Sequence, residues 1–482
     1  MDILHIASEL TPYAKAGGLG DVVAALTKHL RLLGHKVTLV LPRYPAFAKA
    51  GLMTARRLTP LGFELGGKAV EASLYDGRLA SGVELLLVDV PGLYDRPGIY
   101  GEEGRDYEDN ALRFATLCRA AVALARQRAE AGSPFHVLHA HDWPASLALY
   151  YARALERARP ATVLTIHNIA HQGVVPKEAV PEVGIAWADF TMEKAEFYGH
   201  ANLLKTGIVS ADAITTVSET YARDILTPEH GGRLEGVLGK RARDLVGIVN
   251  GVDASVWNPA TDGALAARYD VEDVTNKARC KGALLAELGL DVTADRALAV
   301  FVGRLVYQKG ADLLLAALPK LMAGELSLAV AGDGDPATKK RLEAAAEKYP
   351  GRFALAPAAS EALVHRFFAG SDLTIVPSRF EPGGLVQLYA QRYGSVPVAH
   401  AVGGIRDTVI DCDAALETGT GFLFPAATSA DLTGAVQRAL VAYQSPRWRS
   451  LVRRVMRLDR GWERPARRYE QVYRSVAERS AS

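Results

Sequence analysis

The stretch Ala297-Leu-Ala-Val-Phe-Val-Gly303-Arg304-Leu-Val-Tyr-Gln-Lys309-Gly310 decides the fold. Its first six residues form a short, continuous apolar run, which is typical of a strand buried on both faces of a parallel sheet. A glycine-flanked loop follows, and a helical pattern then occupies Ala311–Met322. A strand, a loop and a helix in this order form the repeating unit of a doubly wound α/β domain.

The same alternation recurs on both sides of this stretch. Helical patterns such as Asp21–Leu33, Glu108–Glu130 and Pro336–Lys348 separate short runs rich in Val, Ile and Leu. The strands expected in the first half are Ile3–Ala7, Lys36–Leu41, Val83–Val90, Val137–Ala140, Thr162–His167 and Ala213–Val217. Those expected in the second half are Ala297–Val302, Ser327–Ala331, Phe353–Ala356, Leu373–Val376, Val396–Ala399 and Gly421–Phe424. Two such sets predict two doubly wound domains.

The chain length also indicates two domains. A single hydrophobic core rarely grows beyond about 250–300 residues, and this chain has 482. The segment Val252–Gly263 is rich in Pro, Asp, Asn and Gly and interrupts the alternation. We therefore expect a first domain at residues 1–251, a second at 252–459, and a final helix within 460–482 that by pattern alone could pack on either.

Composition narrows the class of protein. The formal net charge is +2, and the densest basic run, Arg447–Arg457, has the pattern of an amphipathic helix with a solvated face; a surface that meets a polyanion is the alternative. Cys118, Cys280 and Cys412 have neither metal-site nor disulfide-framework spacing. No signal-peptide pattern and no run of 18 apolar residues is present, so we expect a cytoplasmic protein.

Ligands of open α/β sheets bind beyond the carboxyl ends of the strands, so two such domains predict a site between them, built from post-strand loops. The loop after the first expected strand contains Lys15, Gly17 and Gly18 and runs into a helix at Asp21. Glycines let the backbone approach a ligand, and a helix N-terminus favours anions. The loop therefore resembles an anion cradle, although such turns also occur for purely structural reasons.

Two loops of the second half carry charges that suit a phosphorylated sugar. Arg304 and Lys309 precede a helix, where cations oppose the helix dipole and need a reason to be present. Arginine binds phosphate oxygens bidentately and lysine adds a point charge, so the pair predicts diphosphate binding, with surface charge as the alternative. After the Leu373–Val376 strand, Glu381 stands before a glycine pair, where it either accepts hydrogen bonds from sugar hydroxyls or only begins a helix.

Histidines follow two strands of the first half. His139-Ala-His141-Asp142-Trp143 ends one, and His167-Asn168 ends the next. Residues two apart on a strand share one face and can ligate a metal ion. No third partner is signalled, so we expect no metal site here.

Together these motifs resemble bacterial glycogen synthase and plant starch synthase, the retaining GT-B glucosyltransferases. The resemblance extends from Ile3 to about Tyr469. It rests on the following motifs in order: Lys15-Ala-Gly-Gly-Leu-Gly-Asp21, Leu93-Tyr-Asp-Arg-Pro-Gly98, His139-Ala-His-Asp-Trp143, Thr165-Ile-His-Asn168, Val249-Asn-Gly-Val-Asp253, Gly303-Arg-Leu and Gln308-Lys-Gly310, Pro377-Ser-Arg-Phe-Glu-Pro382 and Gln387-Leu-Tyr389. It implies two Rossmann-like domains facing across a cleft, acceptor side first and donor side second, with the C-terminal helix crossing back to the first.

The resemblance also implies residue roles. By it, Arg304 and Lys309 hold the donor diphosphate, Glu381 binds the glucose, and the backbone carbonyl of His167 faces the anomeric centre. It makes Asp142 a further catalytic residue and Tyr100 a residue of the acceptor cleft. The residues that the resemblance places around the donor are Lys15, Gly17, Gly18, Asp21, Asn250, Gly383, Gly384 and Leu385.

The activity implied by the resemblance is transfer of glucose from ADP-glucose to glycogen or a malto-oligosaccharide with retention, without cofactor or metal and with neither nucleic acid nor membrane as partner. Three positions depart from the family pattern. Gly383 replaces Cys, Val386 replaces Thr, and Ala359 stands where the family commonly packs Tyr against the base. The alternatives are a related transferase that uses UDP-glucose or another acceptor, and an inactive nucleotide- or glucan-binding protein.

Overall fold

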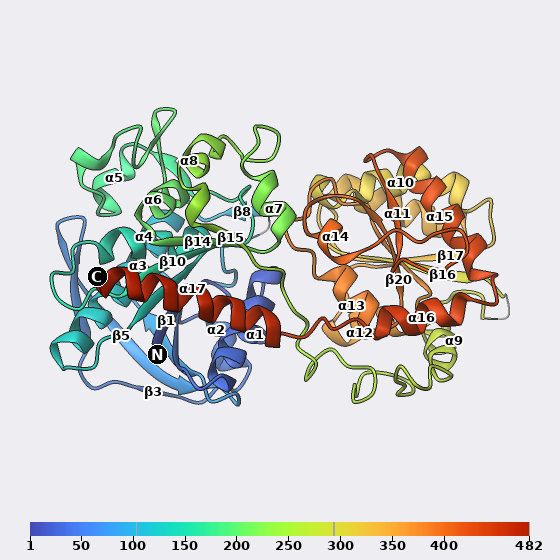
Figure 1. Ribbon diagram of the computed structural model, residues 1–482, viewed down its shortest axis with the longest axis horizontal. Coiled ribbons are helices and arrows are strands. Elements are labelled where there is room, and N and C mark those ends of the chain that lie inside the picture. Colours follow the sequence, from blue (N-terminus) through green and yellow to red (C-terminus); the bar gives the residue numbers. More distant parts are fainter. Residues whose placement is uncertain (103, 293–294, 482) are drawn as a thin grey trace. The chain divides into compact units, whose positions relative to one another are not determined.

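The computed structural model describes residues 1–102, 104–292 and 295–481, and it divides into two compact units. Unit 1 contains residues 1–250 together with the segment from Trp462 onward, and unit 2 contains Gly251–Gly461. Each unit is a sheet with helices packed against it (Figure 1). The expected α/β fold class is therefore confirmed for both.

The sheet of unit 1 has ten strands, in the order β15-β14-β10-β9-β1-β2-β6-β5-β3, with β4 paired to β5. From β15 to β6 the neighbours are parallel. These strands are β1 (Asp2–Ile6), β2 (Lys36–Pro42), β6 (Glu84–Asp89), β9 (Val137–His141), β10 (Ala161–Ile166), β14 (Ala213–Thr216) and β15 (Leu245–Gly247). All six strands expected in this half are present.

The sequence does not signal the antiparallel side of this sheet. β3 (Thr54–Arg56), β4 (Leu61–Leu65) and β5 (Lys68–Arg78) extend it beyond β6. β5 alternates partly buried and exposed residues, as antiparallel strands with one solvated face do, so it has no continuous apolar run. Short strands form two smaller sheets, β7 (Gly101–Glu102) with β8 (Arg105–Asp106), and β11 (Val174–Pro176) with β13 (His200–Asn202) and β12 (Glu196–Phe197).

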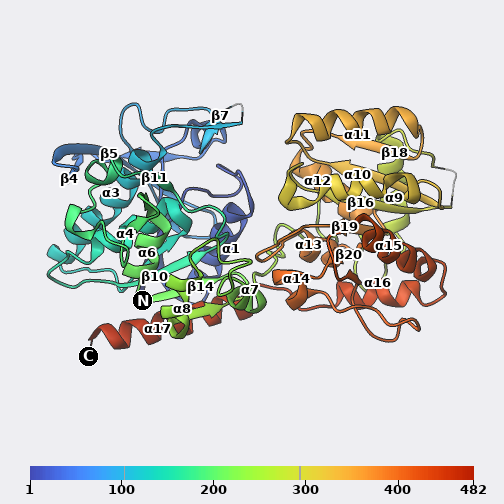
Figure 2. The same ribbon diagram turned by 90° about the horizontal axis from the view of Figure 1, so that it is seen from above.

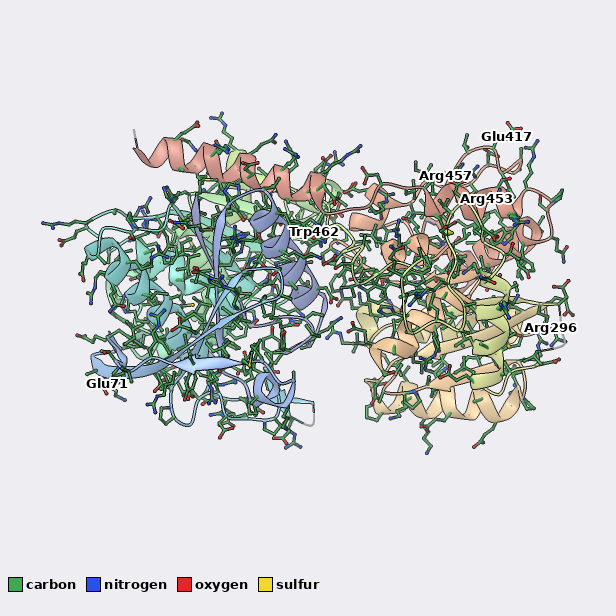
Figure 3. The ribbon with its side chains drawn as sticks, turned by 90° about the horizontal axis from the view of Figure 1, so that it is seen from below. Glu71, Arg296, Glu417, Arg453, Arg457 and Trp462 are labelled. Carbon is green, nitrogen blue, oxygen red and sulfur yellow. The ribbon has the colours of Figure 1, made fainter. Side chains whose placement is uncertain are left out.

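The last helix, α17 (Glu463–Ala481), belongs to unit 1. It packs on α1 (Gly18–Leu32) and β10, and Figure 1 shows it lying along this unit. Its buried face is formed by Ala466, Tyr469, Tyr473 and Val476, which recur at the three- and four-residue spacing of one helix stripe. Trp462, labelled in Figure 3 at the start of this helix, is also buried. The crossing of the C-terminal helix to the first domain is thus confirmed.

Further helices complete unit 1. They are α2 (Pro45–Lys49), α3 (Asn110–Glu130), α4 (Asp142–Ala152), α5 (Ala179–Glu182), α6 (Leu203–Ser210), α7 (Glu219–Asp224) and α8 (Glu235–Lys240), with 3-10 turns η1 (Trp187–Asp189) and η2 (Ala242–Asp244). α4 packs against both α3 and α6.

The sheet of unit 2 is parallel throughout, in the order β18-β17-β16-β19-β20-β21. The strands of this sheet that Figure 2 labels, β18, β16, β19 and β20, follow this order. The strands are β16 (Ala297–Val302), β17 (Leu326–Ala331), β18 (Phe353–Ala356), β19 (Leu373–Val376), β20 (Val396–His400) and β21 (Phe422–Phe424). Along β16, Ala299 and Phe301 join one core cluster while Leu298 and Val300 join another. The strand is therefore buried on both faces, as its apolar run predicts.

Helices cover both faces of this sheet. In Figure 1, α10, α11 and α15 lie on one face, and α9, α12, α13 and α16 lie on the other. The helices are α9 (Lys277–Glu287), α10 (Ala311–Leu321), α11 (Pro336–Lys348), α12 (Glu361–Gly370), α13 (Val386–Arg392), α14 (Gly403–Thr408), α15 (Ser429–Tyr443) and α16 (Trp448–Met456), with the 3-10 turn η3 (Tyr307–Lys309).

The basic run Arg447–Arg457 forms α16, which buries Leu451, Val452, Val455 and Met456. Arg453 and Arg457, labelled in Figure 3, bond to Glu272, and Arg447 bonds to Glu417. These arginines thus contact their own unit from an amphipathic helix, which is the interpretation that the sequence favours. No helix among the described residues is long and apolar enough to span a membrane.

We expect Tyr473→Ala to destabilise unit 1 by about 3–5 kcal/mol, because it removes a fully buried aromatic ring and leaves a cavity. The measurement is hydrogen exchange along a urea titration, in which peptides of β1 and β9 report unit 1 and peptides of β16 and β17 report unit 2. Ser475→Ala, on the exposed face of the same helix, is the control and should change neither unit. Equal loss of protection in both units would contradict the assignment of α17 to unit 1.

Candidate functional site

The candidate loops lie at the points where strand order reverses. In unit 2, β17 and β18 lie on one side of β16 and β19 lies on the other; in unit 1, β2 and β6 lie on one side of β1 and β9 lies on the other. Loops that follow two such neighbouring strands diverge and leave a crevice, which is where open α/β sheets bind ligands. The loops after β16 and β19, and those after β1 and β9, contain the candidate residues.

The glycine-rich loop of unit 1 is held by two carboxylates. The Lys15 ammonium lies 2.8 Å from Oδ1 of Asp21, which also accepts a hydrogen bond from Thr11 Oγ1 at 2.8 Å. Gly17 precedes α1, whose first residues are Gly18, Leu19 and Gly20. A Cβ on Gly20 would approach Thr11 Oγ1 to 3.0 Å, so the loop packs closely. The structure thus brings together Lys15, the glycines and Asp21.

Glu9 is the second of these carboxylates, and the sequence analysis missed it. Its Oε2 accepts hydrogen bonds from the backbone amides of Ala16 and Gly17, both at 2.8 Å. Its Oε1 accepts one from the Tyr100 hydroxyl at 2.8 Å. Two amides of the expected anion cradle are therefore already bonded to an anionic side chain. The available signal is the position of Glu9, directly after a buried strand.

Tyr100 also lines a cavity of about 500 Å³ in unit 1. Its hydroxyl is shared between Glu9 and Ser8, and burial, followed by the Glu9 charge, raises its pKa well above the ordinary range. The other polar and aromatic residues of the cavity wall include Tyr13, Lys15, Tyr44, Arg105 and Asp106. Hydroxyl and charged groups on an aromatic wall suit a polyhydroxylated ligand.

Asp142 and His167 lie together at the ends of β9 and β10. Oδ1 of Asp142 accepts a hydrogen bond from the His167 amide at 2.7 Å and from the Asn168 amide at 3.4 Å. Asp142 has a φ of 54°, the left-handed region that aspartate tolerates better than most residues. Burial raises its pKa to about 7, against the lowering effect of these two amides. The pKa of this carboxyl group thus lies close to neutral pH.

His167 is also the outer end of a group of buried histidines. His141 Nδ1 lies 3.0 Å from His167 Nε2, and His141 Nε2 lies 3.0 Å from His5 Nδ1. His139 stands beside them, with Nδ1 at 2.8 Å from the Tyr473 hydroxyl and Nε2 at 2.6 Å from Thr165 Oγ1. His5, His139 and His141 are fully buried.

The structure brings a third histidine, which the sequence does not signal, beside His139 and His141. One ring nitrogen each of His5, His139 and His141 lies within 4.8 Å of the others. The sequence does not signal His5, because its proximity depends on the parallel register that pairs it with His139. Both nitrogens of His139 and of His141 already have hydrogen-bonding partners, so the rings form a polar network that does not require an ion.

In unit 2, an ion pair joins the two candidate loops. Lys309 Nζ lies 2.6 Å from Glu381 Oε2, which also accepts a hydrogen bond from Ser378 Oγ at 2.9 Å. The Ser378 carbonyl in turn accepts one from His400 Nδ1 at 2.8 Å. Glu381 is 8% exposed, and a carboxylate at that depth needs such partners. The sequence analysis missed the supporting roles of Ser378 and His400.

Glycines allow these loops to touch backbone to backbone. Gly310, with a φ of 72°, would place a Cβ 2.1 Å from the Pro377 carbonyl oxygen. Gly403, with a φ of 43°, would place one 2.2 Å from the Glu381 carbonyl oxygen. Any side chain at either position would separate the loops. A further contact is the guanidinium of Arg379, which binds both carboxylate oxygens of Asp312 beside Lys309.

The remaining predicted residues differ in their surroundings. Arg304 is exposed and forms no ion pair among the residues that the structure describes. Gly383 and Gly384 precede Leu385, the residue before α13, and Gly383 packs against Gly404. Asn250 is buried at the end of unit 1, and its Oδ1 lacks a partner in the described part of the chain.

Ala359 lies in the loop between β18 and α12 and packs partly against one of the two core clusters of unit 2. Its methyl group offers no flat surface to a nucleotide base. Asp333 and Asp335, which superficially resemble an acidic metal pair, serve as an ion-pair partner of Lys339 and as the N-cap of α11.

Comparisons with known proteins cover nearly the whole chain. Residues 2–240 match the family described as starch synthase catalytic domain, and residues 290–447 match glycosyl transferases group 1. A glycogen synthase of Anaeromyxobacter sp. (strain Fw109-5) is 45% identical over 99% of this chain and 100% of its own length. Glycogen synthase 2 of Geobacter sulfurreducens is 40% identical over 99% of both chains.

Solved structures agree on the architecture. The catalytic domain of starch synthase IV from Arabidopsis thaliana, bound to ADP and acarbose, is similar with a TM-score of 0.91 and 31% identity over 99% of both chains. Sucrose-phosphate synthase from Thermosynechococcus elongatus is similar with a TM-score of 0.62 and 19% identity over 100% of both, which is a likeness of fold alone. The first of these matches is similar to this chain in sequence as well as in fold.

We expect unit 1 to lose stability in mild acid before unit 2. Burial lowers the pKa of His5 and of His167 to about 3 and that of His139 and His141 well below the ordinary value. The unfolded chain takes up these protons near pH 6.5. The contribution of the neutral rings is therefore fully present above about pH 6.5 and falls towards pH 3, by up to about 1.4 kcal/mol per pH unit for each ring. Asp142, with its raised pKa, has the opposite sign and offsets one ring.

The measurement is a series of urea titrations at pH 7, 6 and 5, followed by hydrogen exchange in peptides of β1, β9 and β10. The unfolding midpoint of unit 1 should fall with each step, and peptides of β16 and β17 in unit 2 provide the internal reference. An unchanged midpoint for unit 1 between pH 7 and pH 5 would show that these rings are not held neutral.

Proposed function

The chain belongs to the glycogen synthase family of glucosyltransferases, and we propose that it transfers glucose from ADP-glucose to the non-reducing end of an α-1,4-glucan with retention of configuration. The observation that carries this proposal is the Lys309–Glu381 pair, held where the strand order of unit 2 reverses. A cation for phosphate and a buried carboxylate for sugar hydroxyls stand side by side there. A sugar nucleotide offers a phosphate to the cation and hydroxyl groups to the carboxylate.

In the proposed arrangement, Arg304 and Lys309 bind the donor diphosphate. Arg304 is exposed and supplies a planar, bidentate donor, while Lys309 is already oriented by Glu381. Glu381 accepts hydrogen bonds from the glucose hydroxyls. On unit 1, Lys15 contacts the donor phosphates, Gly17 and Gly18 let the loop approach them, and Asp21 orients Lys15. Gly383, Gly384 and Leu385 let the backbone approach the donor, and Asn250 offers its Oδ1, which has no hydrogen-bonding partner among the described residues.

The proposed reaction is a same-face substitution at the anomeric carbon. The C1–O bond to the diphosphate breaks first, its electron pair leaves with the phosphate, and an oxocarbenium-like state forms. The acceptor hydroxyl attacks from the same face and gives its proton to the departing phosphate, so the products are ADP and a glucan longer by one unit. Arg304 and Lys309 stabilise charge that develops on the phosphate. The backbone carbonyl of His167 and the carboxyl of Asp142 face the reacting sugar, and Tyr100 shapes the acceptor side.

This scheme needs no protein nucleophile. Double-displacement glycosidases use two carboxyl groups about 5–5.5 Å apart, on either side of the bond that breaks. In each unit the candidate carboxylates are already engaged: Glu381 with Lys309, and Glu9 with loop amides. Their bonding suits positioning and charge balance, in which catalysis comes from a preorganised site.

The alternative to ADP-glucose concerns the nucleotide base of the donor. Ala359, Gly383 and Val386 all depart from the family pattern around the donor. Aromatic stacking on a base contributes about 1–3 kcal/mol per base in nucleic-acid complexes, and Ala359 cannot supply it. UDP-glucose is therefore the alternative donor, with the phosphate chemistry unchanged.

We expect the purified protein to elongate glycogen with ADP-glucose and to do so much more slowly with UDP-glucose. The measurement is incorporation of labelled glucose into glycogen or maltoheptaose from each donor, with nucleotide release followed in parallel. Elongation from UDP-glucose alone would replace the donor and keep the enzyme class. Absence of elongation from both donors would overturn the proposed function.

Lys309→Ala should lower kcat/KM with the active donor by roughly 100- to 1,000-fold, the effect typical of removing one preorganised group that stabilises transition-state charge. Glu381 loses its cation in this variant but keeps its hydrogen bond from Ser378, so hydrogen exchange in β16 and β19 must first show that unit 2 remains folded. Lys339→Ala removes a lysine of the same unit that pairs with the half-exposed Asp333 and should keep activity within about twofold. Near-normal turnover of Lys309→Ala would refute the role of its ammonium group.

A further inference from the structure

Three imidazole rings in unit 1 form a hydrogen-bonded chain that runs from the protein interior to His167. His5 lies on β1, His141 ends β9 and His167 follows β10, so the chain crosses three adjacent parallel strands. The two N···N distances are both 3.0 Å. His5 and His141 are fully buried, and only His167 is partly exposed. The chain therefore reaches a ligand only at its His167 end.

At neutral pH we expect all three rings to be neutral in the folded protein. Burial lowers the pKa of each, and the neighbouring histidines add to the effect at His141. Within the part of the chain that the structure describes, no carboxylate is among the hydrogen-bonding partners of these ring nitrogens. A neutral imidazole carries one N–H and one bare nitrogen. Each N···N contact holds one proton, so the whole chain has only two arrangements, related by reversal of every bond.

The inner end of the chain distinguishes these arrangements. His5 Nε2 is buried and has no hydrogen-bonding partner among the described residues. In one arrangement this atom carries an N–H without an acceptor; in the other it is a bare nitrogen. In proteins, buried N–H groups without an acceptor are rarer than buried acceptor atoms without a donor. The second arrangement places the protons on Nδ1 of His5, His141 and His167 in turn.

We propose that His141, supported by His5, is a positioning residue that holds the His167 ring in a single orientation with its proton on Nδ1. His141 Nδ1–H donates to His167 Nε2, and the Nδ1–H of His167 remains as a donor for the bound sugar. Asp142 fixes the same residue at its backbone amide, at 2.7 Å. His167 is thus fixed at two points, and its ring presents a donor rather than an acceptor. The contact with sugar rests on the function proposed above; the tautomer does not.

His139 provides a control from within the same cluster. It is equally buried, but its nitrogens bond to Tyr473 and Thr165 and not to His167. A substitution there disturbs the core of unit 1 without breaking the chain. Loss of stability alone is therefore separable from loss of positioning.

The first experiment reads the tautomer directly in the full-length protein without ligand. Selective ¹⁵N labelling of the 12 histidines, with two-bond ¹H–¹⁵N spectra and assignment by His167→Ala, identifies which nitrogen carries the proton. We expect His167 to be protonated on Nδ1 from pH 8 to pH 5, and to show mixed tautomers in His141→Leu. A proton on Nε2 of His167, or stoichiometric metal in the purified protein, would overturn the proposal.

The second experiment tests the effect on catalysis. His141→Leu should lower kcat about tenfold, the cost of one lost hydrogen bond, with a smaller change in KM. His141→Asn, whose amide can occupy the place of Nδ1–H, should recover most of that loss, and His139→Asn should keep kcat within about twofold on folded protein. Equal kcat in His141→Leu and the unsubstituted protein would overturn the positioning role. If no donor supports elongation, the proposed function fails, while the spectra still decide the tautomer.

Discussion

The ion pair between Lys309 and Glu381 is the interaction on which the proposed donor site depends. A carboxylate that is 8% exposed is costly unless a cation and hydrogen bonds compensate its charge. Lys309 supplies the cation and Ser378 a hydrogen bond. Of the two proposed phosphate-binding cations, Lys309 is therefore paired with a carboxylate, whereas Arg304 forms no ion pair within the described chain. Lys15 shows the same arrangement in unit 1, because Asp21 already binds it. Both lysines are thus held in place before any ligand arrives.

Backbone contact between loops makes this pairing possible. Lys309 and Glu381 belong to loops that follow different strands, and their side chains meet because Gly310 lies against the Pro377 carbonyl. A Cβ at that position would push the loops apart. Gly403 allows the same approach to the carbonyl of Glu381 itself. The glycines therefore act by setting the separation of the charged groups.

The sequence predicts those elements and residues that can be identified from a short stretch of neighbouring residues. β16, β18 and β19 have the predicted bounds, because a strand buried on both faces is a continuous apolar run. β5 was missed because its residues alternate, and its antiparallel partners are short. Residues such as Lys309 and Glu381 were found because each follows a buried strand. Glu9 follows one too, but its role depends on a loop folding back upon it, and that of His5 on the register of β1 with β9. Neither the loop contact of Glu9 nor the strand pairing of His5 can be predicted from the spacing of residues along the chain.

The buried histidines illustrate why a polar network can serve such a site better than a charged one. In the proposed reaction, positive charge develops at the anomeric carbon close to His167. A protonated imidazole there would oppose that charge, and its repulsion would grow in a site that excludes water. Burial keeps His5, His139, His141 and His167 neutral, so the rings contribute dipoles and fixed hydrogen bonds without adding a like charge. The acid sensitivity of the neutral network is the expected cost of that arrangement, since below about pH 6.5 these rings gain protons when unit 1 unfolds.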